Sequence, residues 1–154
     1  MIDYARLEFD KETASNLFDF CLEHNLGLAD IEDKSKLTAA DFKFHLTVIY
    51  SRVPNPAFRE GEQDFTAHVL EPMAFDMFGP DKDVLVLKIK PDSVLTSLNE
   101  HYKMVYGHVS DFDPYRPHIT FRGNKAADKA KLKLLSLPSF QLRADKLIHK
   151  IKVE

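Results

Sequence analysis

The sequence is poor in the residues that mark several common classes of protein. It contains one cysteine, Cys21, among 154 residues. A single cysteine excludes a disulfide framework and a thiolate metal cluster, and it fits a reducing compartment. No stretch approaches the roughly 18 apolar residues of a membrane-spanning helix, and the opening segment MIDYARLEFDKE carries alternating charges instead of an apolar leader. We therefore expect a cytoplasmic protein that does not enter a membrane.

Positive charge is not in excess either. The 21 lysines and arginines are outnumbered by 24 aspartates and glutamates, which leaves a formal net charge of −3. A protein that grips long DNA or RNA neutralises many phosphates with a basic surface, so that class of partner is not expected. A small anionic ligand held by a few local groups remains compatible with the composition. The sequence also has no glycine-rich phosphate loop, no HExxH zinc motif and no serine nucleophile elbow.

The residues that are present suffice for one well-packed domain. Hydrophobic residues make up 44% of the chain and include 12 phenylalanines, enough for the core of a single domain spanning residues 1–154. Alternating hydrophobicity predicts strands at 4–9, 44–50, 65–70, 73–78, 83–91 and 118–122, and a closing strand or hairpin at 139–153. Helical spacing predicts one helix from residue 10 to a stop at Asn25 and Gly27, and another at 92–106. Residues 51–64 and 123–138 are predicted as loops, the second with room for a short helix.

The two halves of the chain repeat the same order of elements. Each half runs strand, helix, loop, a strand containing His-x-Thr, loop, and then a strand pair opened by a phenylalanine, Phe65 or Phe140. Sequence identity between the halves is negligible, so the repeat is one of architecture. It predicts an α+β fold of two lobes related by a pseudo-twofold axis. Two mostly antiparallel sheets would face each other across a central cleft, with helices on their outer sides.

Two His-x-Thr motifs lie in predicted strands, within FHLTVIY (44–50) and PHITFR (117–122). Successive residues of a strand point to opposite faces, so each histidine shares a face with the residues two and four positions further on. The first motif thereby groups His45, Thr47 and Ile49, and the second groups His118, Thr120 and Arg122. If the lobes are related by a twofold axis, the two polar faces converge on one cleft.

Paired imidazoles suit the cleavage of a phosphodiester. Because the ordinary pKa of histidine is near neutral, one ring can accept a proton from the attacking oxygen while the other protonates the leaving oxygen. The hydroxyls of Thr47 and Thr120 can donate hydrogen bonds to the non-bridging phosphate oxygens. This chemistry requires no metal or other cofactor. The sequence does not tell which histidine is the acid and which is the base.

Other readings of these residues stay open. A single His-x-Thr in a strand is usually a structural histidine, and it is the pair in matching positions that favours a site. Asp111 and Asp113 precede His118 and leave room for a metal site, although no third histidine or His-x-His pattern accompanies them. The remaining histidines lack such a context and are predicted to be structural or solvated: His24, His68, His101, His108 and His149.

The two motifs resemble those of the two-histidine (2H) phosphoesterases, a family defined by paired His-x-Thr or His-x-Ser motifs flanked by hydrophobic residues. The resemblance covers nearly the whole chain, because the order of elements also agrees. It implies a bilobal, pseudo-symmetric, LigT-like fold and metal-independent cleavage of phosphodiesters. It also implies catalytic roles for His45, Thr47, His118 and Thr120. Substrates of the family include 2′,3′-cyclic phosphates on RNA ends, 2′,5′-linked oligoadenylates and cyclic oligonucleotide messengers.

Within that family, the short length and the YSR that follows the first motif look like a branch of phage enzymes. Those enzymes destroy the cyclic nucleotide signals of bacterial CBASS immunity, so the resemblance implies an anti-CBASS phosphodiesterase in the host cytoplasm. That branch stacks bases on aromatic residues including tryptophan. This chain has no tryptophan, so phenylalanine or tyrosine would take that part. The candidate substrate-binding residues are Phe78, Phe112 and Tyr115 for the base, and Arg52 and Arg122 for a phosphate.

The first expectation is therefore an enzyme that cleaves cyclic di- or trinucleotides. The alternative enzyme is a 2′,3′-cyclic phosphodiesterase or RNA-end-processing protein, or a 2′,5′-oligoadenylate phosphodiesterase. A third hypothesis is a non-catalytic module that sequesters the same small nucleotide. None of these requires an obligate protein partner.

Overall fold

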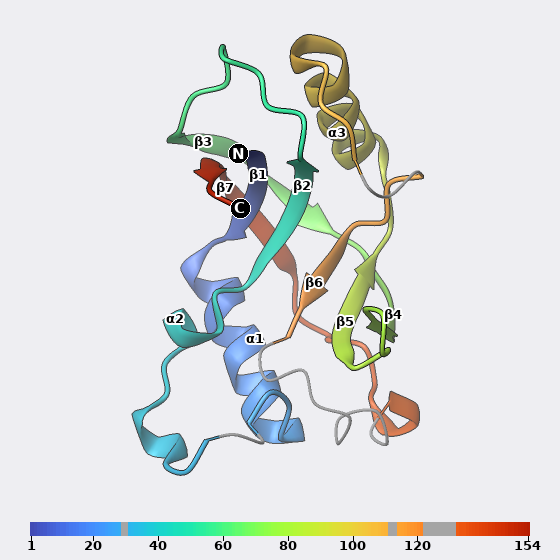
Figure 1. Cartoon of the computed structure of the whole chain (residues 1–154). Coiled ribbons are helices and arrows are strands. Elements are labelled where there is room, and N and C mark those ends of the chain that lie inside the picture. The colour runs from blue at the N-terminus through green and yellow to red at the C-terminus, as the bar shows by residue number, and fades with distance from the viewer. Residues whose placement is uncertain (29–30, 111–113, 122–131) are drawn as a thin grey trace.

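The computed structural model describes residues 1–28, 31–110, 114–121 and 132–154 (Figure 1). Its strands are β1 (Ile2–Phe9), β2 (His45–Ser51), β3 (Gly61–Leu70), β4 (Pro72–Phe78), β5 (Val84–Ile89), β6 (His118–Thr120) and β7 (Leu142–Lys152). Its α-helices are α1 (Lys11–His24), α2 (Ala39–Phe42) and α3 (Ser93–Tyr106). Short 3-10 turns lie at Lys34–Lys36 and Leu132–Leu134. No helix of the described chain is both long and apolar enough to cross a membrane.

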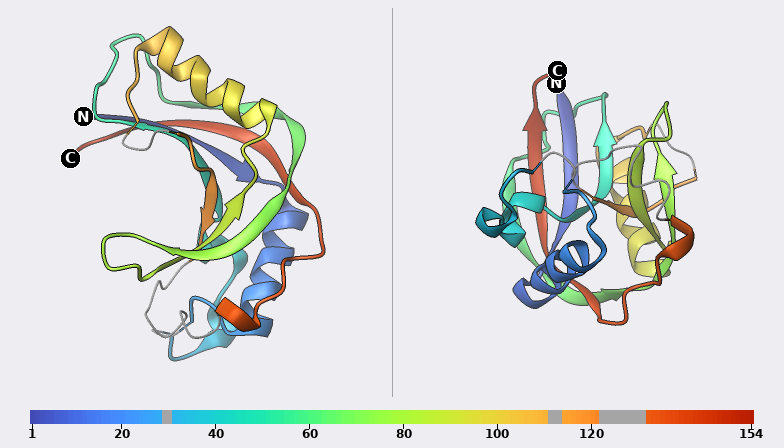
Figure 2. Two further views of the ribbon diagram at one scale, coloured as in Figure 1. Left: turned by 90° about the vertical axis from the view of Figure 1, so that its right-hand side faces the viewer. Right: turned by 90° about the horizontal axis from the view of Figure 1, so that it is seen from below.

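All described strands belong to one antiparallel sheet, in the order β3-β7-β1-β2-β6-β5-β4. The chain is thus α+β, but it differs from the expected pair of sheets facing a cleft. The two halves join because β2 and β6 pair directly, with Leu46 opposite Ile119. The joined sheet is strongly curved, so that one face is concave (Figure 2). Curvature, not a gap between sheets, therefore creates the hollow side of the molecule.

The order of elements is the same on both sides of the central β2–β6 pair. The unit β1-α1-β2 lies on one side and β5-α3-β6 on the other, and β1 and β5 are the outer neighbours of β2 and β6. The last strand departs from the expected repeat. Instead of forming a strand pair with its own half, β7 is one long strand that inserts between β1 and β3. The first half of the sheet thereby gains a strand from the end of the sequence.

Both long helices end where the local sequence predicts. The side chain of Asp10 accepts a hydrogen bond from the backbone of Thr13 at the start of α1, and Asp92 does the same for Leu95 at the start of α3. Asn25 ends α1 with a left-handed backbone (φ 52°), and Gly107 ends α3 with φ 66°. The helices lie on the outer, convex side of the sheet (Figure 2).

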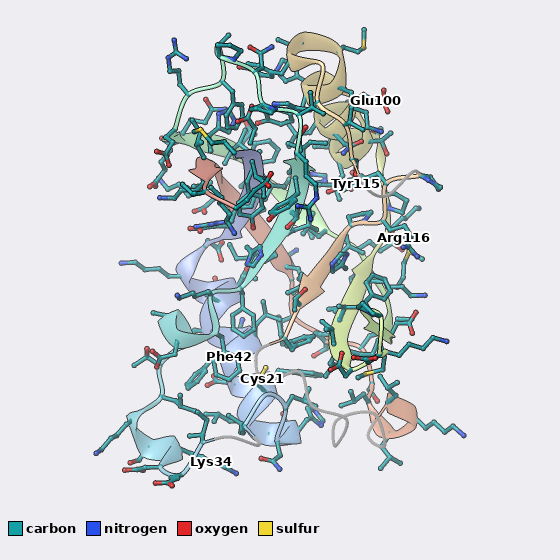
Figure 3. All side chains as sticks on the ribbon, viewed as in Figure 1. Cys21, Lys34, Phe42, Glu100, Tyr115 and Arg116 are labelled. Carbon is teal, nitrogen blue, oxygen red and sulfur yellow. The ribbon has the colours of Figure 1, made fainter. Side chains whose placement is uncertain are left out.

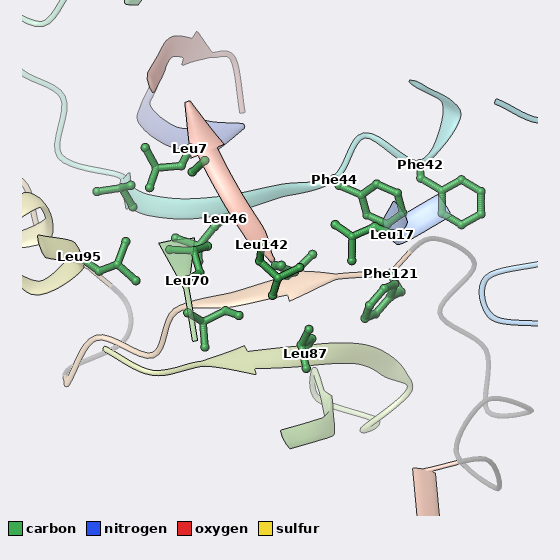
Figure 4. Packing of buried hydrophobic residues seen from close by; sticks show 14 of the residues in the cluster. Leu7, Leu17, Phe42, Phe44, Leu46, Leu70, Leu87, Leu95, Phe121 and Leu142 are labelled. Atoms are coloured by element: carbon green, nitrogen blue, oxygen red, sulfur yellow. The ribbon is translucent and has the colours of Figure 1, made fainter. Parts of the chain in front are cut away.

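One hydrophobic core lies under these helices and draws on both halves of the chain. Leu7, Leu46 and Ile119 are fully buried at its centre. Leu17 of α1 and Leu95 of α3 close it from the helix side (Figure 4). Burying the middle residue of each His-x-Thr motif in this core turns the histidine and threonine on either side of it toward the concave face.

Candidate active site

The two histidines lie on adjacent central strands. With Leu46 opposite Ile119 in an antiparallel pair, Thr47 comes to lie across from His118, and Thr120 across from His45. The two histidines are then diagonal neighbours, and such residues have backbones about 7–8 Å apart. Both rings are half-buried, whereas the residues between the motif positions, Leu46 and Ile119, have no exposed surface. The predicted alternation of faces around each motif is therefore present.

Each imidazole is held by the same hydrogen bond. Nδ1 of His45 lies 2.7 Å from the carbonyl oxygen of Lys43, and Nδ1 of His118 lies 2.8 Å from that of Arg116. A carbonyl oxygen only accepts, so both rings carry their hydrogen on Nδ1 and donate it. Each neutral ring therefore keeps Nε2 as its proton acceptor. The two sides of the site match in tautomer as well as in residue type.

Burial lowers the pKa of both histidines below the ordinary value of 6.5. The bond to the backbone carbonyl opposes this effect on each ring, and a nearby arginine, Arg6 for His45 and Arg116 for His118, adds to it. Both imidazoles are consequently neutral at pH 7 in the free protein. A bound anion beside them would favour the imidazolium form.

An irregularity in β2 changes which residues face the site. Arg6 of β1 pairs with Thr47, but the preceding residue, Ala5, pairs with Ile49, so Val48 is an extra residue in β2. The prediction that Ile49 shares the face of His45 is therefore wrong, since the bulge reverses the alternation and Ile49 is buried. Tyr50 takes the place on the concave face, next to Tyr4, with ring centres 5.6 Å apart.

Side chains from the second half of the chain stabilise this bulge. The hydroxyl of Tyr115 donates to the carbonyl of Thr47 at 2.6 Å, and Nδ2 of Asn99 donates to the carbonyl of Val48 at 2.8 Å. Asn99 lies in α3 and is only 1% exposed. The two carbonyls at the bulge thus have side-chain donors, and the shape of β2 depends on contacts far away in sequence.

A pocket of about 300 Å³ lies beside His118. Thr47, Tyr50, Tyr115 and Arg116 contribute to its wall, so it is mainly aromatic and apolar with one cation at its margin. Figure 3 labels Tyr115 and Arg116 on the segment that leads into β6. The expected substrate-binding residue Tyr115 is therefore beside the motif, although its hydroxyl is already used by the bulge.

The other expected substrate-binding residues lie in different places. Phe78 packs edge-on against the ring of His118, with centroids 4.9 Å apart, and Arg116 lies over its face at 5.3 Å. The guanidinium of Arg52 lies over the ring of Tyr50 at 5.7 Å, close to the same face. Phe112 and Arg122 fall outside the described residues. Their roles, like those of Phe78 and Arg52, stay predictions.

A larger pocket of about 900 Å³ lies beside His45, where β1 runs into α1 and α2 leads into β2. Tyr4 lines this pocket and is only 4% exposed. Its hydroxyl accepts a long hydrogen bond (3.5 Å) from the hydroxyl of Thr47. Arg6 and Lys152 line it as well. Two pockets therefore flank the histidine pair, one on each side.

The remaining histidines make structural contacts away from the concave face. His108 is buried with Asp3, at 2.9 Å from its carboxylate, and His68 contacts the Asp92 cap of α3 at 2.8 Å. His149 lies 2.5 Å from the hydroxyl of Tyr102. Among the described residues, no cluster of three or more potential metal ligands forms. Asp111 and Asp113, the candidates for a metal site, lie outside those residues.

Sequence reasoning missed several residues of this face. Tyr4 and Arg6 belong to the polar side of a strand that was predicted, so their alternation was available as a signal. A cation also stands two residues before each histidine, in KFH and RPH, and this repeat was readable as well. Tyr50 and Lys152 had no such signal, because a bulge and a long-range strand pairing bring them in.

The comparison with protein families agrees with the anti-CBASS resemblance. The model of the family Anti-CBASS protein Acb1 matches residues 3–143, which include both histidine motifs and the two pockets apart from Lys152. No curated protein matches the sequence. Since the family match extends over most of the 154 residues, the chain belongs to the Anti-CBASS protein Acb1 family.

Proposed function

We propose that this protein is a metal-independent phosphodiesterase of the two-histidine type that cleaves cyclic oligonucleotides. The observation that carries the proposal is the matched pair of imidazoles, His45 and His118. Both have Nδ1 bound to a backbone carbonyl and Nε2 left for proton transfer. The hydrogen bond at Nδ1 fixes the tautomer of each ring, and the two rings lie on adjacent strands. One ring can therefore act as the base and the other as the acid on opposite sides of one phosphorus atom. The bilobal 2H fold is part of this proposal.

The reaction would proceed through an internal hydroxyl. Nε2 of one neutral histidine takes the proton from a 2′-hydroxyl, and that oxygen attacks the adjacent phosphorus. The other histidine, protonated at Nε2, gives its proton to the departing 5′-oxygen as the P–O bond breaks. The products are a 2′,3′-cyclic phosphate and a 5′-hydroxyl. The hydroxyls of Thr47 and Thr120 would donate to the non-bridging oxygens, where negative charge is held in the transition state.

The choice of cyclic oligonucleotides rests on the family and on the pockets. Phage enzymes of the resembling branch destroy the cyclic nucleotide signals of CBASS, and an anti-CBASS role is shared by this family. Two tyrosines, Tyr50 and Tyr115, line the pocket beside His118. Stacking a base on an aromatic side chain contributes roughly 1–3 kcal/mol. A nucleotide bound there would present its phosphate to the histidines.

The substrate panel is the direct test. The purified protein is incubated with EDTA and with 3′,5′-cyclic di- and trinucleotides, 2′,5′-oligoadenylate and 2′,3′-cyclic nucleotides, and products are identified by mass. We expect cleavage of the cyclic oligonucleotides to proceed at the same rate with and without EDTA, because two histidines supply both proton transfers. Binding without turnover would instead identify a sequestering module. Preference for 2′,3′-cyclic nucleotides would identify an RNA-end enzyme, and complete loss with EDTA would contradict the mechanism.

The pH dependence gives a second prediction. Because burial lowers the pKa of both His45 and His118 below 6.5, the free enzyme holds one protonated and one neutral ring only at acidic pH. The bell-shaped profile of kcat/KM, which reports the free enzyme, is expected to peak below pH 6.5. The profile of kcat should peak at higher pH, since bound phosphate stabilises the imidazolium. A kcat/KM maximum in the alkaline range would contradict this assignment.

A further inference from the structure

The pocket beside His45 gathers positive charge in a chain whose net charge is negative. Four cationic side chains line it, Arg6, Lys11, Lys43 and Lys152, and Glu8 is the one carboxylate of its described lining. The chain as a whole has 24 acidic and 21 basic residues, so the ratio of cations to carboxylates in this pocket differs from that of the whole chain. We propose that this pocket is an anion subsite that binds a second, non-scissile phosphate of the substrate.

The cations come from four separate segments. Arg6 lies in β1, Lys11 begins α1, Lys43 follows α2, and Lys152 ends β7. Lys43 adopts a left-handed backbone (φ 50°), which lets the chain turn sharply from α2 into β2 beside the pocket. Bringing like charges together from such distant segments costs free energy through repulsion. A bound anion removes this cost.

Most of this charge is not neutralised within the described chain. Arg6 contacts Glu8 through Nε at 2.8 Å, so the single carboxylate of the pocket is already paired. No carboxylate of the described residues forms an ion pair with Lys11, Lys43 or Lys152. Lys152 instead lies over the ring of Tyr4 at 4.5 Å and near that of Tyr50 at 5.8 Å. The Lys152 ammonium is therefore positioned by aromatic rings while its hydrogen-bond donors stay available to a ligand.

The position and size of the pocket fit a second phosphate. His45 lines the pocket and also belongs to the candidate site. The cations of the pocket would therefore lie next to the scissile phosphate. At about 900 Å³ it has room for a nucleotide unit and not only for an ion. A cyclic di- or trinucleotide carries one phosphate per nucleotide, so at least one phosphate lies away from the bond being cleaved. This inference rests on the proposed function, and it selects substrates with two or more phosphates over mononucleotides.

The test compares substrates that differ in their number of phosphates. The double variant Lys11→Gln with Lys152→Gln removes two charges from the pocket and leaves the histidines unchanged. A matched control, Lys36→Gln with Lys90→Gln, removes two exposed lysines that lie outside the pocket beside Asp33 and Glu71. Each protein is assayed on a 3′,5′-cyclic dinucleotide, with two phosphates, and on a linear 3′,5′-dinucleoside monophosphate, which has one phosphate and keeps the internal 2′-hydroxyl. The Kd of each of these two ligands is also measured for the same variants in the His118→Ala background, which should bind without turnover.

We expect the pocket variant to raise KM and Kd for the cyclic dinucleotide by about tenfold, because two ammonium groups that attract the second phosphate are removed. The change on the single-phosphate substrate and in the control variant should be below about threefold. Equal effects on both substrates, or equal effects of both variants, would overturn the subsite. If the parent cleaves neither substrate, the proposed function fails, and the Kd values in the His118→Ala protein still decide on the subsite.

Discussion

Replacing His45 or His118 by alanine is expected to lower kcat on a cyclic dinucleotide by about 10²–10⁴-fold, because each ring supplies one of the two proton transfers. Binding should persist within about tenfold, since an aromatic pocket and cations also hold the ligand. Turnover is followed by product mass, and Kd is measured by calorimetry. The double variant should be little slower than either single variant, because acid and base act as a unit.

His101 offers a matched control for this experiment. It is exposed on α3, on the opposite side of the sheet from the histidine pair, and His101→Ala is expected to retain the parent rate. If His45→Ala kept more than a tenth of the parent turnover, the acid–base assignment would be refuted. A parent protein that binds tightly but never turns over would leave the sequestering module as the explanation.

Asn99→Ala is expected to lower the free energy of unfolding by about 1–3 kcal/mol, because the buried carbonyl of Val48 loses its hydrogen-bond donor. Asn99 has 1% of its surface exposed, so water cannot replace the donor without opening the helix–sheet contact. The same change should raise KM, because the bulge places Tyr50 on the concave face. Urea unfolding at pH 7 and steady-state kinetics measure the two effects.

Ser97→Ala, an exposed change on the same helix, is the control and should alter stability by less than about 0.5 kcal/mol. A loss of stability at Asn99 with unchanged KM would show that the bulge does not shape the binding face. An unfolding free energy equal to that of the parent would mean that the carbonyl of Val48 finds another donor.

The local structure was largely predictable because its causes are local. Alternation located β1, β2 and β5, and helical spacing with Asp10 and Asp92 as caps located α1 and α3. The loop after the first motif is shorter than predicted, because β3 begins at Gly61 within the segment predicted as loop. The exposed residues of that edge give little hydrophobic signal, and pairing with β7 is what makes them a strand.

The candidate site was predictable in its motifs and not in its surroundings. His45, Thr47, His118 and Thr120 are on one face as the period of two requires. The face predicted for Ile49 is wrong, and Tyr50 takes its place, because one extra residue reverses every later position in a strand and leaves no mark in the composition. Lys152 lies 107 positions after His45 in the sequence, and only the pairing of β1 with β7 brings it near Tyr4.

The sequence alone determined that two imidazoles and two hydroxyls stand on polar strand faces, because the backbone period of two acts residue by residue. It also determined the helix ends and the α+β class. The tertiary structure decided that the halves share one sheet, that Val48 bulges, and that four cations meet beside His45. These features depend on hydrogen bonds and charges between segments distant in sequence, and such pairings are chosen only when the whole core is assembled.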